Sequence, residues 1–130
     1  MNRKNSILAL RPALSLSTEH SSIQEKFQNN TLRPILKFQN DFLIKCFQNH
    51  CIQRKCNFEI LNELQKKAFI EDSLRKDQRF KQLLLGSIIG LFTIEEYSNY
   101  LNYDKEYNRR MITMITKRLQ DELIIIENYE

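Results

Sequence analysis

The sequence predicts an all-α protein, a compact bundle of five to six helices around a buried central helix that contains glycine. The chain has only two glycines and two prolines in 130 residues, which disfavours turn-rich β architectures. Apolar residues recur at spacings of three and four along much of its length, as they do in amphipathic helices. The most apolar stretch, residues 83–92, is apolar on every side, which is typical of a helix at the centre of a bundle.

Both glycines, Gly86 and Gly90, lie in this central stretch, one helical turn apart. An interior glycine costs roughly 1 kcal/mol of helix stability relative to alanine, so a packing reason is expected. We expect the two glycines to form a flat strip against which another helix of the same chain packs. A slot for a ligand or a partner is the alternative. The stretch is shorter than the roughly 20 apolar residues that cross a bilayer, and no membrane association is expected.

Residues 1–21 are expected to form a flexible or loosely docked N-terminal arm, and residues 22–130 a single helical domain. The apolar part of the arm is interrupted by Arg11 and Pro12, which argues against a secretory signal. A transit peptide and a short helix docked on the bundle remain alternatives. Residues 1–18 carry three bases and no acid, so the rest of the chain is close to neutral.

Three helices are predicted before the central stretch. Residues 22–30 form a short polar helix, which Pro34 then kinks or restarts. An amphipathic helix follows and ends near Arg54. Asn57 is the predicted cap of the third helix, which either stops at Asp77 or continues into the central stretch.

The central stretch is predicted to end in a sharp corner at Thr93. Thr93 and Glu96 have the spacing of a capping box, in which each side chain bonds the other residue's backbone N–H. A helix of about three turns follows, and Asp104 caps the last helix. The predicted apolar stripe of that helix is Ile112, Ile115, Leu119 and Ile126.

One cluster of side chains is able to bind a metal or to act as a reactive thiol: Cys46, His50, Cys51 and Cys56. Its spacing does not match the paired ligand groups of zinc sites, and free cysteine is a common buried residue. We therefore predict no metal, no catalytic residue and no cofactor. An odd number of closely spaced cysteines favours a reducing compartment, and the bacterial cytoplasm is expected.

An aromatic stretch surrounds the starts of the last two predicted helices. Tyrosine buries a large area while keeping a polar tip, which suits a contact surface for a protein partner or a second copy of the chain. Core packing is the alternative explanation for the same residues. The predicted contact residues are Gly86, Gly90, Tyr97, Tyr100, Arg109 and Arg110.

Nucleic-acid binding is not expected. The densest basic stretch, residues 66–81, is interleaved with acidic residues, and the pairing of charges on a solvated helix face explains it. A nucleic-acid footprint would be a basic stripe without those acids.

Four groups of residues carry a family resemblance: Leu32-Arg33-Pro34-Ile35-Leu36 with Gln39-Asn40; Arg75-Lys76-Asp77; Gly86 and Gly90-Leu91-Phe92-Thr93 with Glu95-Glu96-Tyr97; and Asn108-Arg109-Arg110-Met111. With these groups the chain resembles, over about residues 25–123, a family of small all-helical bacterial proteins without assigned biochemistry. Some members carry a glyoxalase label, which implies paired βαβββ units with His and Glu metal ligands on strands. This sequence has no strand series and only His20 and His50, so no catalytic residue is carried over.

The sequence therefore predicts a non-catalytic helical interaction or regulatory module. A homodimer is one form that such a module would take. Two alternatives remain open. One is a small lyase of glyoxalase type or a thiol-redox protein that uses the region from Cys46 to Cys56. The other is a weak nucleic-acid-binding protein.

Overall fold

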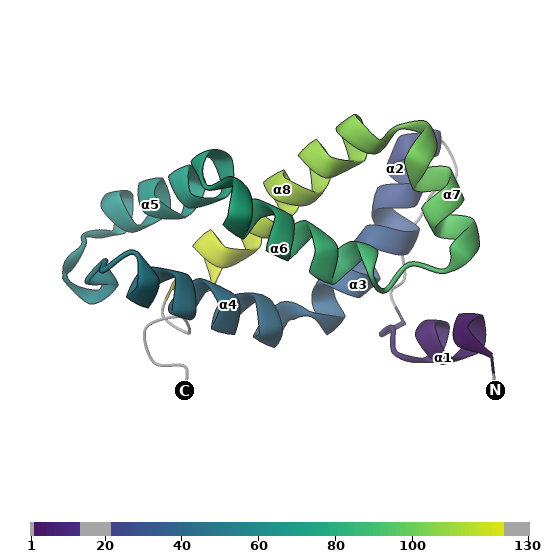
Figure 1. The fold of residues 1–130 in the computed structure, drawn as a ribbon, viewed down its shortest axis with the longest axis horizontal. Coiled ribbons are helices and arrows are strands. Elements are labelled where there is room, and N and C mark those ends of the chain that lie inside the picture. The colour runs from purple at the N-terminus through teal and green to yellow at the C-terminus, as the bar shows by residue number, and fades with distance from the viewer. Residues whose placement is uncertain (1, 14–21, 124–130) are drawn as a thin grey trace. The chain divides into compact units, whose positions relative to one another are not determined.

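A computed structural model describes residues 2–13 and 22–123, and every regular element in these two ranges is a helix (Figure 1). The all-α prediction is confirmed. The elements are α1 (Arg3–Ala9), α2 (Ile23–Phe27), the π-helix η1 (Gln28–Leu32), α3 (Arg33–Phe38), α4 (Asn40–Gln53), the 3₁₀-helix η2 (Phe58–Ile60), α5 (Glu63–Lys76), α6 (Gln78–Ile89), α7 (Ile94–Asn102) and α8 (Asp104–Asp121). None of the described helices has the length and apolarity that a bilayer crossing requires.

The chain divides into two compact units, each built from segments that are far apart in the sequence. Unit 1 comprises Met1–Gln39 and Leu85–Met111, and unit 2 comprises Asn40–Leu84 and Ile112–Glu130. Because α6 and α8 cross these boundaries, each of the two helices contributes one part to each unit.

An aromatic cluster forms the core of unit 1. The buried ring of Phe27 lies 4.4 Å from that of Tyr107 and 5.6 Å from that of Phe92, measured between ring centroids. Tyr100 is also buried and lies 5.7 Å from Phe92. Such pairs contribute about 0.5–1.5 kcal/mol each beyond the area that they bury.

The π-helix η1 connects α2 to α3 in unit 1. In a regular α-helix Pro34 would have no N–H to donate to the carbonyl of Asn30, and its ring would clash with that carbonyl. The wider turn lets the Arg33 N–H donate to the Gln28 carbonyl, five residues back. The predicted kink at Pro34 takes this form. The helix itself breaks later, at Gln39, where the sequence predicted a continuous helix.

Unit 2 is built around Phe47, which is fully buried on α4. Its ring centroid lies 5.4 Å from that of Phe58 and 5.9 Å from that of Phe69. α4 ends with Lys55 in the left-handed region, at φ 53°, and the Cys56 N–H then donates to the Cys51 carbonyl. This is the hydrogen bond of a Schellman motif, and it turns Cys56 out of the helix.

α5 begins later than predicted. Asn62, and not Asn57, caps it, and Gln65 completes a capping box with both reciprocal hydrogen bonds. Asn57 instead precedes the short helix η2. The break at Asp77, which the sequence left open, is present, because the Asp77 side chain accepts the Phe80 N–H and caps α6.

The corner at Thr93 is confirmed, with both hydrogen bonds of the capping box formed. In α8 the buried side chains are Tyr107, Met111, Ile115 and Leu119. Ile112 is only half-buried, and the predicted Ile126 lies outside the described residues.

The prediction of a glycine-containing helix buried on every side is wrong. α6 buries Leu84, Leu85 and Ile88, but Gly86 and Gly90 are exposed. Apart from its chain neighbours and the backbone of its own helix, a Cβ added at Gly86 would meet no described atom within 4 Å, so no other element packs against it there. The physical reason is that glycine has no side chain, so the face with both glycines has the least apolar area to bury.

Candidate functional site

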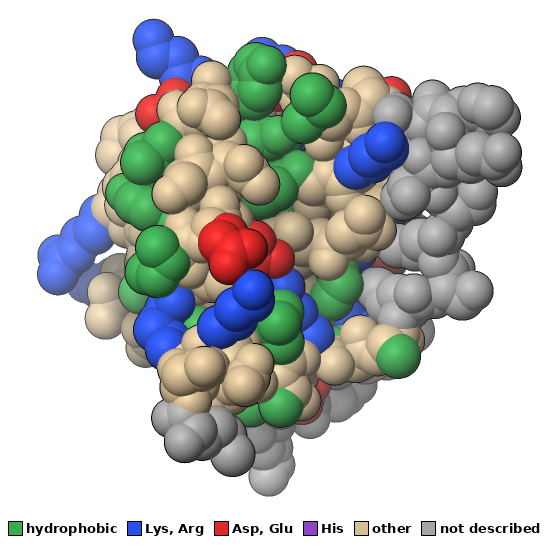
Figure 2. All heavy atoms as spheres, turned by 90° about the vertical axis from the view of Figure 1, so that its right-hand side faces the viewer, with side chains coloured by type: hydrophobic (Ala, Val, Ile, Leu, Met, Phe, Trp, Pro, Cys, Tyr) green, Lys and Arg blue, Asp and Glu red, His purple; other side chains and the backbone are tan. Residues whose placement is uncertain are grey.

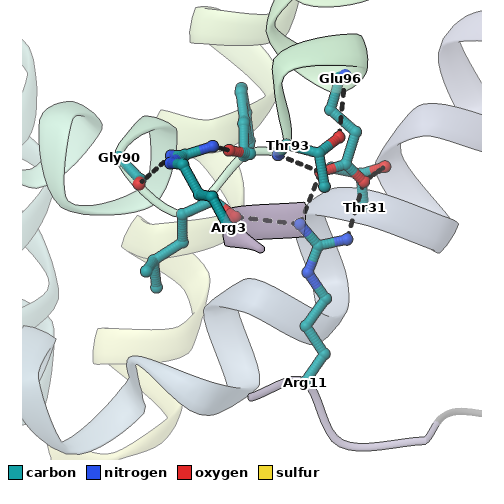
Figure 3. Close-up of polar contacts among 8 residues, drawn as sticks. Arg3, Arg11, Thr31, Gly90, Thr93 and Glu96 are labelled. Carbon is teal, nitrogen blue, oxygen red and sulfur yellow. Dashed lines mark hydrogen bonds and ion pairs between the residues drawn. The ribbon is translucent and has the colours of Figure 1, made fainter. Parts of the chain in front are cut away.

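The N-terminal part of unit 1 is bound to the corner before α7 (Figure 3). Arg3 Nη1 donates to the Phe92 carbonyl at 2.7 Å, and Nη2 donates to the Gly90 carbonyl at 3.1 Å. Arg11 donates from Nη1 to Glu96 Oε2 at 2.7 Å, and its second nitrogen bonds the other oxygen of the same carboxylate. This bidentate pair adds geometric specificity as well as energy.

Glu96 is the centre of this cluster. Its side chain is 17% exposed and that of Arg11 is 9% exposed. The Thr31 hydroxyl and the Thr93 N–H also donate to Glu96, at 3.0 and 2.8 Å. Burial alone would raise the pKa of Glu96, but the hydrogen bonds from Arg11, Thr93 and Thr31 hold the pKa below its ordinary value. Since these donors occupy both carboxylate oxygens, the cluster orients α7 and offers no general base.

The outer face of α7 is apolar and exposed. The side chains of Ile94, Tyr97 and Leu101 are 70%, 43% and 53% exposed. Their spacing of three and four residues places them in one stripe, which we call the α7 stripe. Figure 2 turns the right-hand side of Figure 1, where α7 lies, toward the viewer, and exposed hydrophobic side chains are spread over this face. Large contiguous apolar patches mark interaction sites in proteins, and this stripe is a small one.

The six predicted contact residues do not share one accessible surface. Tyr97, Arg109 and the two glycines are exposed. Tyr100 is buried, and its hydroxyl donates to Asn108 at 2.6 Å. Arg110 is half-buried, and it donates to Gln28 at 2.8 Å. The sequence prediction missed Ile94 and Leu101, although their spacing from Tyr97 was visible.

The three cysteines of unit 2 are poor nucleophiles. Burial raises the pKa of Cys51 to about 12, and it also raises the pKa of Cys46 and of Cys56. All three therefore carry a protonated thiol at neutral pH. Within residues 2–13 and 22–123, no three His, Cys, Asp or Glu side chains are arranged to hold a metal ion.

A hollow of about 550 Å³ lies between α4 and α6 in unit 2, and we call it the α4–α6 groove. It brings together Cys46 and His50 from the predicted cluster, but not Cys51 or Cys56. Its lining residues are Lys45, Cys46, Asn49, His50, Gln53, Asp77, Arg79, Phe80 and Leu83.

His50 is the buried polar residue of this groove. Its side chain is 6% exposed, and its ring stacks on Phe80 with centroids 4.0 Å apart. Nδ1 lies 4.0 Å from Asp77 Oδ2, and Nε2 is buried without a hydrogen-bond partner in the described structure. Burial lowers the pKa of His50, against the opposing effect of the Asp77 charge, so the imidazole is neutral at physiological pH.

The comparisons with known proteins identify no relative. No family model matches the chain. No curated protein and no solved structure matches it either. The resemblance to small helical bacterial proteins stays a prediction, and the function is inferred from the geometry of the two units alone.

Proposed function

We propose that the protein is a non-catalytic interaction module that pairs with a second copy of itself through the α7 stripe. One observation carries the proposal. A stripe of three large apolar side chains faces outward from a helix whose first turn is fixed by the Glu96 cluster. Holding an apolar face rigidly in solvent costs free energy, and a partner that covers it recovers that cost.

The charges around the stripe favour a second copy as the partner. Glu95, at the start of α7, is already paired with Lys4, with Nζ 2.9 Å from Oε1. The remaining exposed polar residues of α7 are uncharged: Ser98, Asn99 and Asn102. Two identical faces of this kind meet across a two-fold axis without like-charge repulsion, whereas a charged partner finds no complementary charge there.

Three side chains cover less than the roughly 800 Å² that each partner contributes to a standard interface. Exposed apolar residues elsewhere in unit 1, such as Leu8 and Ile23, are available to enlarge the contact. We therefore expect a weak dimer, with a dissociation constant on the order of micromolar or above.

Two observations support a non-catalytic role over the thiol-enzyme alternative. The raised thiol pKa values disfavour nucleophilic or redox chemistry at Cys46, Cys51 and Cys56. The buried carboxylate of Glu96 is committed to Arg11 and to the backbone of Thr93.

The test is sedimentation equilibrium of the full chain over a range of micromolar concentrations. We expect the wild type to dimerise and Leu101→Glu to remain monomeric, because the substitution places a charge in the middle of the stripe. Leu64→Glu is the matched control, since Leu64 is 79% exposed but lies on α5 in unit 2. A wild type that is monomeric throughout, or a dimer that Leu101→Glu leaves intact, would overturn the proposal.

A further inference from the structure

We propose that the α4–α6 groove of unit 2 binds a small organic anion, a carboxylate or phosphate group attached to an apolar body. This inference is independent of the α7 stripe, which belongs to the other unit. It rests on the charges of the rim and on the apolar surface between them.

The rim of the groove is cationic. Lys45 and Arg79 are both exposed, and within the described structure neither pairs with a carboxylate. Lys45, Asn49 and Gln53 follow one another at four-residue spacing, so they form a row of hydrogen-bond donors along α4. Two exposed cations beside neutral amide donors suit an anionic head group.

Asp77 does not cancel this positive charge, because its carboxylate is used within the protein. Oδ1 accepts the Phe80 N–H at 3.1 Å, and Oδ2 lies 4.0 Å from Arg54 Nε and from His50 Nδ1. The backbone hydrogen bond from Phe80 is the largest cause that keeps the pKa of Asp77 below its ordinary value. Asp77 and Arg54 therefore balance each other, and the charges of Lys45 and Arg79 remain.

The surface between these charges is apolar. Leu83 is 53% exposed and lies four residues after Arg79, so the two form the α6 side of the groove. Phe80 and Cys46 line it with aromatic and thiol surface. At about 550 Å³ the groove is within the range of 300–1,000 Å³ that is typical of small-molecule sites. An amphiphilic anion matches both parts of this lining, whereas inorganic phosphate matches only the rim.

His50 limits where the head group binds. The buried Nε2 of His50 lacks a hydrogen-bond partner in the described structure, and most buried polar atoms have one. Because Nδ1 faces the Asp77 carboxylate, the neutral ring favours a proton on Nδ1, which leaves Nε2 as a buried acceptor. An acceptor cannot bond an ionised carboxylate or phosphate, so the head group binds at the rim, and His50 contributes only ring surface to the groove.

The test is a titration of the full chain, followed by NMR or calorimetry, with hexanoate and hexyl phosphate as probes and with hexan-1-ol and inorganic phosphate as comparisons. We expect saturable binding of the two amphiphilic anions, and much weaker binding of the alcohol and of inorganic phosphate. Comparing hexanoate with hexyl phosphate tells which head group the rim prefers.

Arg79→Gln and Lys45→Gln should each weaken binding about fivefold, as the loss of one exposed charge contact predicts. Arg75→Gln is the matched control, because Arg75 is an exposed cation of unit 2 that pairs with Asp72 on α5. It should leave the affinity unchanged. The proposal fails if neither anion binds saturably, if hexan-1-ol binds as tightly as hexanoate, or if Arg75→Gln weakens binding as much as Arg79→Gln.

Discussion

Each unit buries one ionisable side chain with a different degree of hydrogen bonding, although Arg11 Nε beside the first is, like His50 Nε2, buried without a partner in the described structure. In unit 1 the carboxylate of Glu96 is buried, and Arg11, Thr31 and Thr93 satisfy it. In unit 2 the imidazole of His50 is buried, but only one of its nitrogens faces a partner. A buried charge that is fully hydrogen-bonded makes a structure rigid, whereas an incompletely bonded group is sensitive to its surroundings. The comparison suggests that unit 1 presents a fixed surface and that unit 2 responds to ligands and to pH.

The largest effect is expected from a substitution that breaks the Glu96 cluster of unit 1. Glu96→Ala leaves Arg11 buried without its anion and removes one half of the capping box at Thr93. We expect a loss of about 3–5 kcal/mol in the free energy of unfolding, as is usual when one partner of a buried pair is deleted. Urea unfolding followed by tyrosine fluorescence measures it, since four of the five tyrosines, Tyr97, Tyr100, Tyr103 and Tyr107, belong to unit 1.

Glu95→Ala is the control for that experiment. Glu95 is 74% exposed and forms a surface pair with Lys4, so its removal should cost no more than about 0.5 kcal/mol. Equal effects of the two substitutions would mean that burial does not distinguish these carboxylates. The double variant Arg11→Met with Glu96→Met should be less destabilised than Glu96→Ala, because it leaves no unpaired charge.

A second prediction is that the stabilities of the two units depend differently on pH. The pKa of His50 is lowered by burial, so the unfolded chain takes up a proton before the folded chain does as the pH falls. The stability that His50 contributes is complete above its ordinary pKa of 6.5 and is lost as the pH falls from there toward the folded pKa. The pKa of Glu96 is also lowered, but its contribution is lost only below the ordinary value of 4.5.

Unit 2 should therefore weaken before unit 1 between pH 6.5 and 4.5. The measurement is hydrogen exchange, corrected for the intrinsic effect of pH, which compares amides of α4 with amides of α7. The charged groups around the imidazole are Asp77 and Arg54, with Lys45 and Arg79 on the same groove. His50→Gln should abolish the early loss in α4. An unchanged pH dependence in that variant would assign the effect to other groups.

The smallest expected effects are a pair of gains, one in each unit. Gly86→Ala should stabilise unit 1 by about 0.5–1 kcal/mol, because the site is exposed, helical and open around the new methyl group. Lys55→Gly should stabilise unit 2 by a similar amount, about 0.5–1 kcal/mol, because glycine adopts the left-handed conformation without the steric cost that lysine incurs. Thermal unfolding of both variants checks these values. A loss of stability in either variant would mean that the original residue makes a stabilising contact, and it would contradict the prediction.

Local signals in the sequence predicted local structure well. The capping box at Thr93 and Glu96 needs only two residues three positions apart, and it is present. Asp77 with two bases before it indicated a helix boundary in the same way. Asn62 and Gln65 have the same spacing and form a capping box, although the prediction placed the cap at Asn57.

The relations that decide the candidate sites depend on tertiary structure. Arg11 and Glu96 are 85 positions apart, and nothing in their local sequence indicates that they pair. The burial of the glycine helix was mispredicted because the composition of the stretch was averaged over all its faces. The buried residues Leu84, Leu85 and Ile88 lie on one face of the helix, and the glycines are exposed. The average composition of the stretch does not distinguish the buried face from the exposed one.

The wide turn of η1 determines which side chains of its helix face inward. Phe27 and Leu32 are five positions apart, and both are buried. In a regular α-helix such residues would point about 140° away from each other, since each residue adds about 100°. The rotational phase of the helix is therefore corrected within one turn, and Pro34 is the residue that makes the correction necessary. With alanine at that position, the segment could form a regular α-helix, but Phe27 and Leu32 would then not both face the protein interior.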